Sequence, residues 1–162
     1  MTEGPAKKME TAHRLELSDL AELRRFAEAL ASRLEPGQVW LLRGELGAGK
    51  TTLVREVCAA LGVARHKVVS PSFTLLQEYE GGRLPIVHVD LYRLDPGRGL
   101  DSLGLEEQFA RNDSVMFIEW PDSAGDRLPP GSLSLGIEFG AEDGARVLTI
   151  PFIVAAPDPA RD

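Results

Sequence analysis

The sequence predicts an α/β fold of the P-loop NTPase kind, with a mixed sheet, flanking helices and antiparallel hairpins. A short apolar run at residues 39–42 precedes the glycine-rich segment 44–51, and a helical pattern follows that ends at Gly62. Strand, glycine-rich turn and helix in this order form the context that a phosphate-binding loop requires. The later strands alternate only partly with helices, which favours antiparallel additions to the sheet.

The chain's 162 residues fit one domain with a core of its own. Residues 1–13 are polar and show no pattern, so we expect a flexible leader there. We expect the P-loop domain to span residues 14–152 and a flexible tail to follow at residues 153–162.

Before the glycine-rich segment, apolar residues recur at helical spacing from Leu20 to Leu34. Ser18 is a suitable cap for the start of this helix, and Pro36-Gly37 stops it. After the second helix, Gly81-Gly82 is typical of a hairpin turn. The remaining predicted elements are strands at 73–79 and 84–89, a short helix at 105–109, a strand at 115–118, and a hairpin over 133–150 that turns near residues 143–144.

Charge and composition argue against some classes of function. The net charge is -7 and the pI about 5.0, which argues against a domain that grips nucleic acid by itself but leaves open a role inside a complex that holds RNA. Cys58, the one cysteine, lies in an apolar helical stretch and is expected to be a buried structural thiol. No apolar run approaches the length of about 18 residues that a membrane span needs, and the first residues lack a signal's apolar core. We therefore expect a cytoplasmic protein that does not enter a membrane.

The glycine-rich segment matches the pattern GxxxxGK[ST] in full. Glycines allow the backbone N–H groups to converge on phosphate oxygens, and the following helix adds the positive end of its dipole. Lys50 would supply a cation to the outer phosphates, and the Thr51 hydroxyl would ligate Mg²⁺. ATP with Mg²⁺ is the predicted ligand. The segment reads Gly44, Glu45, Leu46, Gly47, Ala48, Gly49, Lys50, Thr51.

A P-loop also needs an acidic residue for the metal, usually where a neighbouring strand ends. Asp90 and Glu119 each follow a mostly apolar run, and either could instead cap its strand and face solvent. His88 is interpreted as a satisfied core histidine, and Trp120 as a packing residue. The segment 70–74 is either a loop with hydroxyls near the phosphates or a turn that enters a strand.

Five blocks in one order, GELGAGKTT, SPSFTLLQEY, HVDLYRL, GLEEQF and IEWPD, closely resemble the bacterial TsaE (YjeE) family over about residues 14–150. The resemblance implies an ATPase, slow alone, that acts with TsaD and TsaB. That family is required for N6-threonylcarbamoyladenosine at position 37 of tRNAs that read codons beginning with A. The tRNA would be reached indirectly, through the complex.

The resemblance also implies roles for single residues. Asp90, Glu119 and Lys50 would be catalytic, and Thr51 with Glu119 would ligate Mg²⁺. The segment 70–74 would respond to the nucleotide state. The implied nucleotide-binding residues are Glu45, Leu46, Gly47, Ala48, Gly49, Lys50, Thr51, Thr52 and, in the last hairpin, Arg146, with Trp120 as a neighbour.

Two positions depart from the family's pattern. Ser72 stands where threonine is typical, which keeps a hydroxyl. Leu23 and Ala27 stand in the first helix where the family commonly has a threonine and a glycine near the base.

Two alternatives come from other classes. A small P-loop metabolite kinase would need an arginine-rich lid and an acceptor pocket, and neither is evident. A GTP-dependent switch would fit the DxxG-like residues 122–125, but no guanine-reading motif follows.

Overall fold

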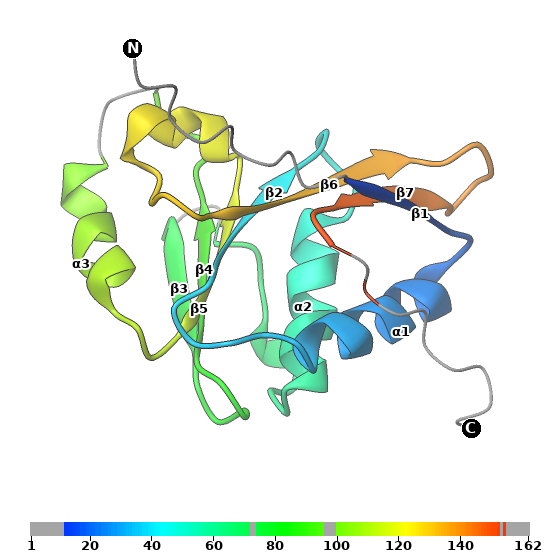
Figure 1. Ribbon diagram of the computed structural model, residues 1–162, viewed down its shortest axis with the longest axis horizontal. Helices are drawn as coiled ribbons and strands as arrows, with labels where there is room; N and C mark the ends of the chain where they lie inside the picture. The colour runs from blue at the N-terminus through cyan, green and yellow to red at the C-terminus, as the bar shows by residue number, and fades with distance from the viewer. Residues whose placement is uncertain (1–11, 72–73, 96–99, 153, 155–162) are drawn as a thin grey trace, which may run out of the picture.

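The computed structural model describes residues 12–71, 74–95, 100–152 and 154. Seven strands form one sheet in the order β1-β7-β6-β2-β5-β4-β3 (Figure 1). The strands are β1 (His13–Leu17), β2 (Val39–Arg43), β3 (Leu76–Tyr79), β4 (Ile86–Asp90), β5 (Val115–Glu119), β6 (Leu133–Phe139) and β7 (Arg146–Ile150). The helices are α1 (Leu20–Ala31), α2 (Lys50–Ala60) and α3 (Leu105–Ala110), with 3-10 turns η1 (Arg65–Lys67), η2 (Asp101–Leu103) and η3 (Pro121–Arg127).

The centre of the sheet is parallel and both of its ends are antiparallel. β2 pairs in parallel with β5 and β6, and β5 pairs in parallel with β4. β3 joins β4, and β7 joins β6 and β1, as antiparallel additions. The predicted mixed sheet is thus confirmed. Because β2, β4 and β5 run in one direction, their carboxyl ends meet at one edge, where α/β sheets bind ligands.

Helices α1 and α2 lie side by side against one face of the sheet (Figure 1). Their apolar faces meet the inward residues of β2, β5, β6 and β7 in the larger core, where Trp40, Phe26, Phe117 and Leu53 are almost fully buried. Cys58 of α2 lies in this core, as predicted, and burial raises the pKa of its thiol to about 12.

The opposite face is covered over only part of its width. A second core joins Leu41, Val89 and Ile118 of the parallel strands to Leu105 of α3 and Ala124 of η3. On the same side, none of the described helices covers the face of β1, β7 and β6, which borders a hollow lined by Arg14, Thr149 and Gly136, among others. Within the described ranges, helices cover both faces of the sheet only around β2, β5 and β4.

The first helix differs from the prediction at both ends. Asp19, not Ser18, is the cap, because its carboxylate accepts a hydrogen bond from the Glu22 backbone N–H at 2.9 Å. The helix ends at Ala31. Leu34 is buried all the same, in turns that follow the helix.

One strand was not predicted, and two others have bounds that differ from those predicted. β1, in which Leu15 and Leu17 point toward the helices, was not predicted, because five mostly polar residues carry too little alternation to be recognised. β3 begins only at Leu76, since Leu75 adopts a left-handed φ of +64° in a turn. β4 begins after Pro85 and extends to Asp90. Of the predicted leader and tail, residues 1–11, 153 and 155–162 lie outside the described residues.

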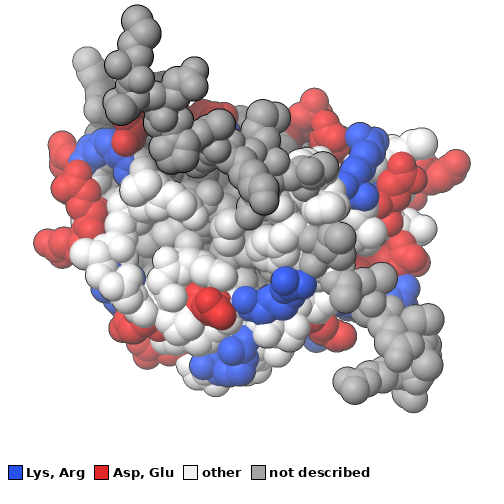
Figure 2. Space-filling view, viewed as in Figure 1, with Lys and Arg blue, Asp and Glu red and all other residues white. Residues whose placement is uncertain are grey.

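Charge is dispersed on the face seen in Figure 2, where lysine and arginine alternate with aspartate and glutamate rather than gathering in one basic patch. Within the described ranges, none of the helices is long and apolar enough to cross a membrane.

Candidate nucleotide site

The glycine-rich loop connects β2 to α2 at the sheet edge where the parallel strands end. Two glycines are required by its shape. Gly49, the cap of α2, has a φ of +115°, a conformation that side chains disfavour. Gly44 passes so close to β6 that a Cβ atom there would lie 2.4 Å from the Ile137 carbonyl oxygen. The loop therefore curls ahead of the α2 N-terminus, as anion binding requires.

Lys50 folds back over this loop. Its Nζ donates hydrogen bonds to the carbonyl oxygens of Gly44 at 2.6 Å and Glu45 at 2.9 Å, and lies 4.2 Å from the centre of the Trp120 ring. Burial lowers the pKa of the ammonium group, while the carboxylates of Glu119 and Asp90 oppose that shift. The cation is thus held where phosphates would arrive, by neutral acceptors that a phosphate can replace.

Glu119, the last residue of β5, is the acidic residue that touches the P-loop helix. Its Oε1 accepts a hydrogen bond from the Thr51 hydroxyl at 2.7 Å and lies 2.7 Å from Nε2 of His88. The side chain is almost fully buried. The family resemblance implied Thr51 and Glu119 as partners around one metal, and the two side chains are in direct contact.

Asp90 ends β4 directly beside Glu119 in the parallel register. Its Oδ1 accepts a hydrogen bond from the Tyr92 backbone N–H at 3.0 Å, and its Oδ2 accepts one from the Ser70 hydroxyl at 3.5 Å. Burial is the main cause that raises the pKa of this carboxyl group, and the charge of Glu119 adds to it. Asp90 is therefore a second acidic residue, one strand away from the first, and its raised pKa makes it hold a proton more readily than an ordinary aspartate.

Trp120 follows Glu119 with a left-handed φ of +57°. That conformation is rare for an aromatic residue and tends to occur at functional sites. It turns the chain into η3 and brings the indole over Lys50 and against Tyr92, whose ring centre is 4.8 Å away. Trp120 is only partly exposed, but it packs on site residues and not simply in the core.

Arg146, at the start of β7, reaches the loop from the final hairpin. Its Nε donates to the Ala48 carbonyl oxygen at 2.6 Å, and its guanidinium carbon lies 4.7 Å from the centre of the Phe139 ring. The side chain also approaches Gly49. Of the arginines in the described residues, it is the one that donates to the loop between β2 and α2.

A cavity of about 400 Å³ gathers most of the predicted residues. Glu45, Ala48 and Arg146 do not line it, although the first two belong to the same loop and the third binds it. Its lining is Leu46, Gly47, Gly49, Lys50, Thr51, Thr52, Ser70, Asp90, Tyr92, Arg93, Glu119 and Trp120.

Sequence reasoning missed three participants near this cavity. Tyr92 and Arg93 line it, and both stand in the block HVDLYRL, whose position after Asp90 was the available signal. His88 was interpreted as a satisfied core histidine. It is indeed fully buried, but Nε2 meets Glu119, and Nδ1 has no hydrogen-bond partner among the described residues. Of the segment 70–74, residues 72–73 lie outside the described residues.

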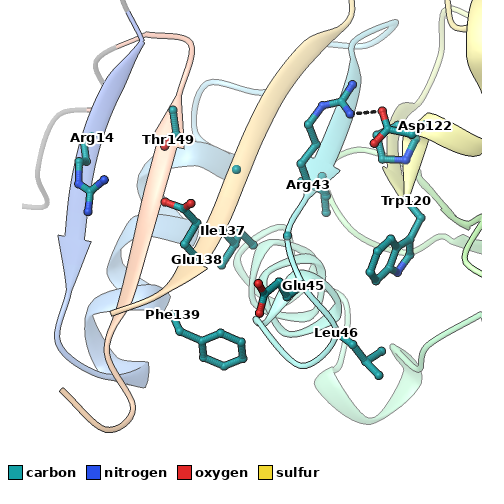
Figure 3. Close-up of a pocket in the computed structure, with 14 residues that line it drawn as sticks. Arg14, Arg43, Glu45, Leu46, Trp120, Asp122, Ile137, Glu138, Phe139 and Thr149 are labelled. Carbon is teal, nitrogen blue, oxygen red and sulfur yellow. Dashed lines mark hydrogen bonds and ion pairs between the residues drawn. The ribbon is translucent and has the colours of Figure 1, made fainter. Parts of the chain in front are cut away.

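A larger hollow of about 980 Å³ adjoins this cavity at Leu46 and Trp120. It lies over the open face of the sheet, with Arg43 joined to Asp122 along one wall and Phe139 near the loop (Figure 3). Its lining does not include Lys50, Thr51, Asp90 or Glu119. The smaller cavity, not the larger, therefore has the groups for phosphate chemistry.

The donor set fits Mg²⁺. Thr51 and Glu119 offer hard oxygen ligands at one point, next to a loop shaped for phosphates. Within the described part of the chain, no group of three metal-binding side chains is present. Mg²⁺ usually takes one or two protein ligands and completes its shell with phosphate oxygens and water.

Comparison with known proteins identifies the family. The family described as "Threonylcarbamoyl adenosine biosynthesis protein TsaE" matches residues 17–147. The chain belongs to the TsaE family. It is 37% identical over 122 residues to the tRNA threonylcarbamoyladenosine biosynthesis protein TsaE of Bacillus subtilis (strain 168), covering 75% of each chain. It is 39% identical over 126 residues to the corresponding protein of Nostoc sp., covering 76% of each.

A solved structure has a similar fold. The crystal structure of YdiB from Bacillus subtilis matches with a TM-score of 0.70 and 30% identity, covering 86% of this chain and 84% of that one. In this TsaE-family fold, Leu23 and Ala27, the two departures in the first helix, are buried in the core beside α2. Neither lines the nucleotide cavity.

Proposed function

We propose that this chain binds ATP with Mg²⁺ and hydrolyses it, and that it serves N6-threonylcarbamoyladenosine synthesis on tRNAs that read codons beginning with A. TsaD and TsaB are the proposed partners. The observation that carries the proposal is the meeting of Lys50, Thr51, Asp90 and Glu119 around one cavity in front of a P-loop. The names of its relatives in Bacillus subtilis and Nostoc support the pathway.

The loop's own groups would bind the phosphates. Backbone N–H groups at the start of α2 face the anion together with the helix dipole. Lys50 would exchange its bonds with two carbonyl oxygens for bonds to phosphate oxygens, which are charged and hence stronger acceptors. The guanidinium of Arg146, which donates to the Ala48 carbonyl oxygen, is the proposed second cation.

Thr51 and Glu119 would hold the Mg²⁺ ion. When bound, this ion neutralises charge that develops on the phosphates during transfer. Asp90, one strand away, would orient the attacking water through its carboxylate, since its neighbours Tyr92 and Ser70 fix the orientation of that group. A small P-loop kinase would use the same loop, but the family to which the chain belongs supports the role in tRNA modification.

The preference for ATP over GTP tests this proposal. ATP should bind more tightly than GTP, by about tenfold, which corresponds to roughly 1.4 kcal/mol. The reason is that no guanine-reading motif follows the P-loop in the sequence. Isothermal titration calorimetry with both nucleotides and Mg²⁺ measures the difference. Tighter binding of GTP would favour a switch protein instead.

Apolar side chains beside the loop support a protein partner. Leu46 is 68% exposed, Tyr92 52% and Phe139 51%, and all three lie close to the P-loop or its cavity. Large apolar groups gathered at one place on a surface are typical of protein interfaces. A partner seated there would cover the mouth of the cavity.

Phe139→Ser should weaken capture by immobilised TsaD–TsaB in the presence of ATP, by about tenfold or more, because buried aromatic side chains dominate such contacts. Leu20→Ser is the matched control, since Leu20 is 45% exposed but stands on α1, outside the lining of the cavity. A pull-down with both variants, alongside their ATP affinities, measures the effect. Equal capture of both would exclude this face as the interface.

A further inference from the structure

His88 lies in the middle of β4, between Gln77 of β3 and Phe117 of β5 in the register of the sheet. Its side chain has no exposed surface. Its sheet neighbours on the same face, Ile86 and Phe117, belong to the apolar core. A leucine would suit such a position, because burying an imidazole ring costs free energy unless its nitrogens are hydrogen-bonded.

Only one of the two nitrogens has a partner. Nε2 lies 2.7 Å from Oε1 of Glu119, whereas Nδ1 is buried and has no hydrogen-bond partner in the described residues. A carboxylate that is to ligate a metal is ionised and only accepts hydrogen bonds, so Nε2 must then carry the hydrogen. A hydrogen on Nδ1 would be a buried donor without an acceptor. The geometry thus selects the tautomer with hydrogen on Nε2.

This bond determines how Glu119 presents its carboxylate. Oε1 accepts from two donors, His88 from the core side and the Thr51 hydroxyl from α2. No donor in the described part of the chain reaches Oε2, and Glu119 lines the nucleotide cavity. With Oε1 fixed by the two donors, the lone pairs of Oε2 remain available to a cation.

We propose that His88 is a positioning residue for the Mg²⁺ site: its Nε2–H holds the Glu119 carboxylate in the orientation that ligates the metal. This rests on the proposed function. The histidine touches neither nucleotide nor metal and acts through Glu119 alone. Partners of this kind, one step removed from a metal, typically contribute 10- to 100-fold to metal affinity.

Four variants separate this role from core packing. His88→Leu removes the donor and keeps an apolar side chain. His88→Gln places an amide N–H near the position of Nε2, and His88→Asn is too short to reach Glu119. His66→Leu, in the exposed turn η1, is the matched control for a histidine far from the site.

Metal affinity is measured with Mn²⁺ and ADP by electron paramagnetic resonance, and ADP affinity without metal by calorimetry in EDTA. His88→Leu and His88→Asn should weaken Mn²⁺ binding in the ADP complex by about 10- to 100-fold and leave metal-free ADP binding unchanged. His88→Gln and His66→Leu should bind Mn²⁺ like the wild type. In the nucleotide-free wild type, ¹⁵N NMR of the imidazole should show the hydrogen on Nε2.

Mn²⁺ binding by His88→Leu or His88→Asn as tight as in the wild type would overturn the proposal, as would a hydrogen on Nδ1. Comparable losses in His88→Gln and His88→Asn would also overturn it, because they would point to packing alone. Failure of the proposed function has a different signature. In that case the wild type itself would bind ADP no better with Mg²⁺ than in EDTA, and both proposals would fall.

Discussion

Lys50→Ala should lower kcat/KM for ATP hydrolysis by about 10³-fold, the loss typical when a charged donor to the transition state is removed. The substitution deletes the one lysine that lines the cavity, and its ammonium group is held at the mouth of the P-loop by two carbonyl oxygens. Gly44 is only half-buried and Glu45 is exposed, so water can replace the ammonium group at those oxygens. The fold should therefore survive.

Lys50→Met is the matched control, because it keeps the length of the side chain and its contact with Trp120 but removes the charge. Both variants should lose activity alike if the charge matters and the packing does not. Steady-state kinetics, ATP calorimetry and thermal unfolding followed by circular dichroism give the three readouts. Hydrolysis at the wild-type rate by a folded Lys50→Ala protein would refute the P-loop assignment.

Glu119→Ala should reduce hydrolysis by about 10³-fold or more, while ATP affinity falls much less than in Lys50→Ala. Hydrolysis needs the metal fixed at the phosphates, whereas the loop amides and Lys50 bind the nucleotide without that ligand. The contact of Glu119 with the Thr51 hydroxyl makes it the expected direct ligand. Single-turnover hydrolysis and calorimetry with and without Mg²⁺ separate the two effects.

Asp90→Asn is the informative comparison, since both acidic residues end neighbouring strands and face the same cavity. If Asp90 orients water, this variant should hydrolyse slowly yet keep the Mg²⁺ dependence of ATP binding. A loss of that dependence in Asp90→Asn but not in Glu119→Ala would reverse the two roles.

The residues of the site could be predicted to a large degree because their signals are local. The P-loop is one continuous segment, and each acidic residue follows its own apolar strand. The parallel register then sets Asp90 beside Glu119 without further information. What remained hidden were contacts between separate strands. The bond between His88 and Glu119 joins β4 to β5, and no pattern around either residue specifies it.

For the fold, too, elements with local signals were predicted and those that depend on distant partners were missed. The central elements were predicted from apolar periodicity and turn residues, and the mixed sheet followed. β1 was not predicted, because its formation depends on pairing with β7 at the other end of the chain. The cap of α1 was misplaced because Ser18 and Asp19 are adjacent and equally suitable by type. Only the hydrogen bond to the Glu22 backbone chooses between them.

The two hydrogen bonds that fold Lys50 over its own loop also compete with an incoming anion for the ammonium group. Any anion that enters must first displace the ammonium group from the Gly44 and Glu45 carbonyl oxygens. A ligand with a single phosphate has few contacts with which to offset that loss. A nucleoside triphosphate would engage the amides, the lysine and the metal together. The two bonds would therefore favour ligands with several phosphates over a single phosphate, before any contact with the base is made.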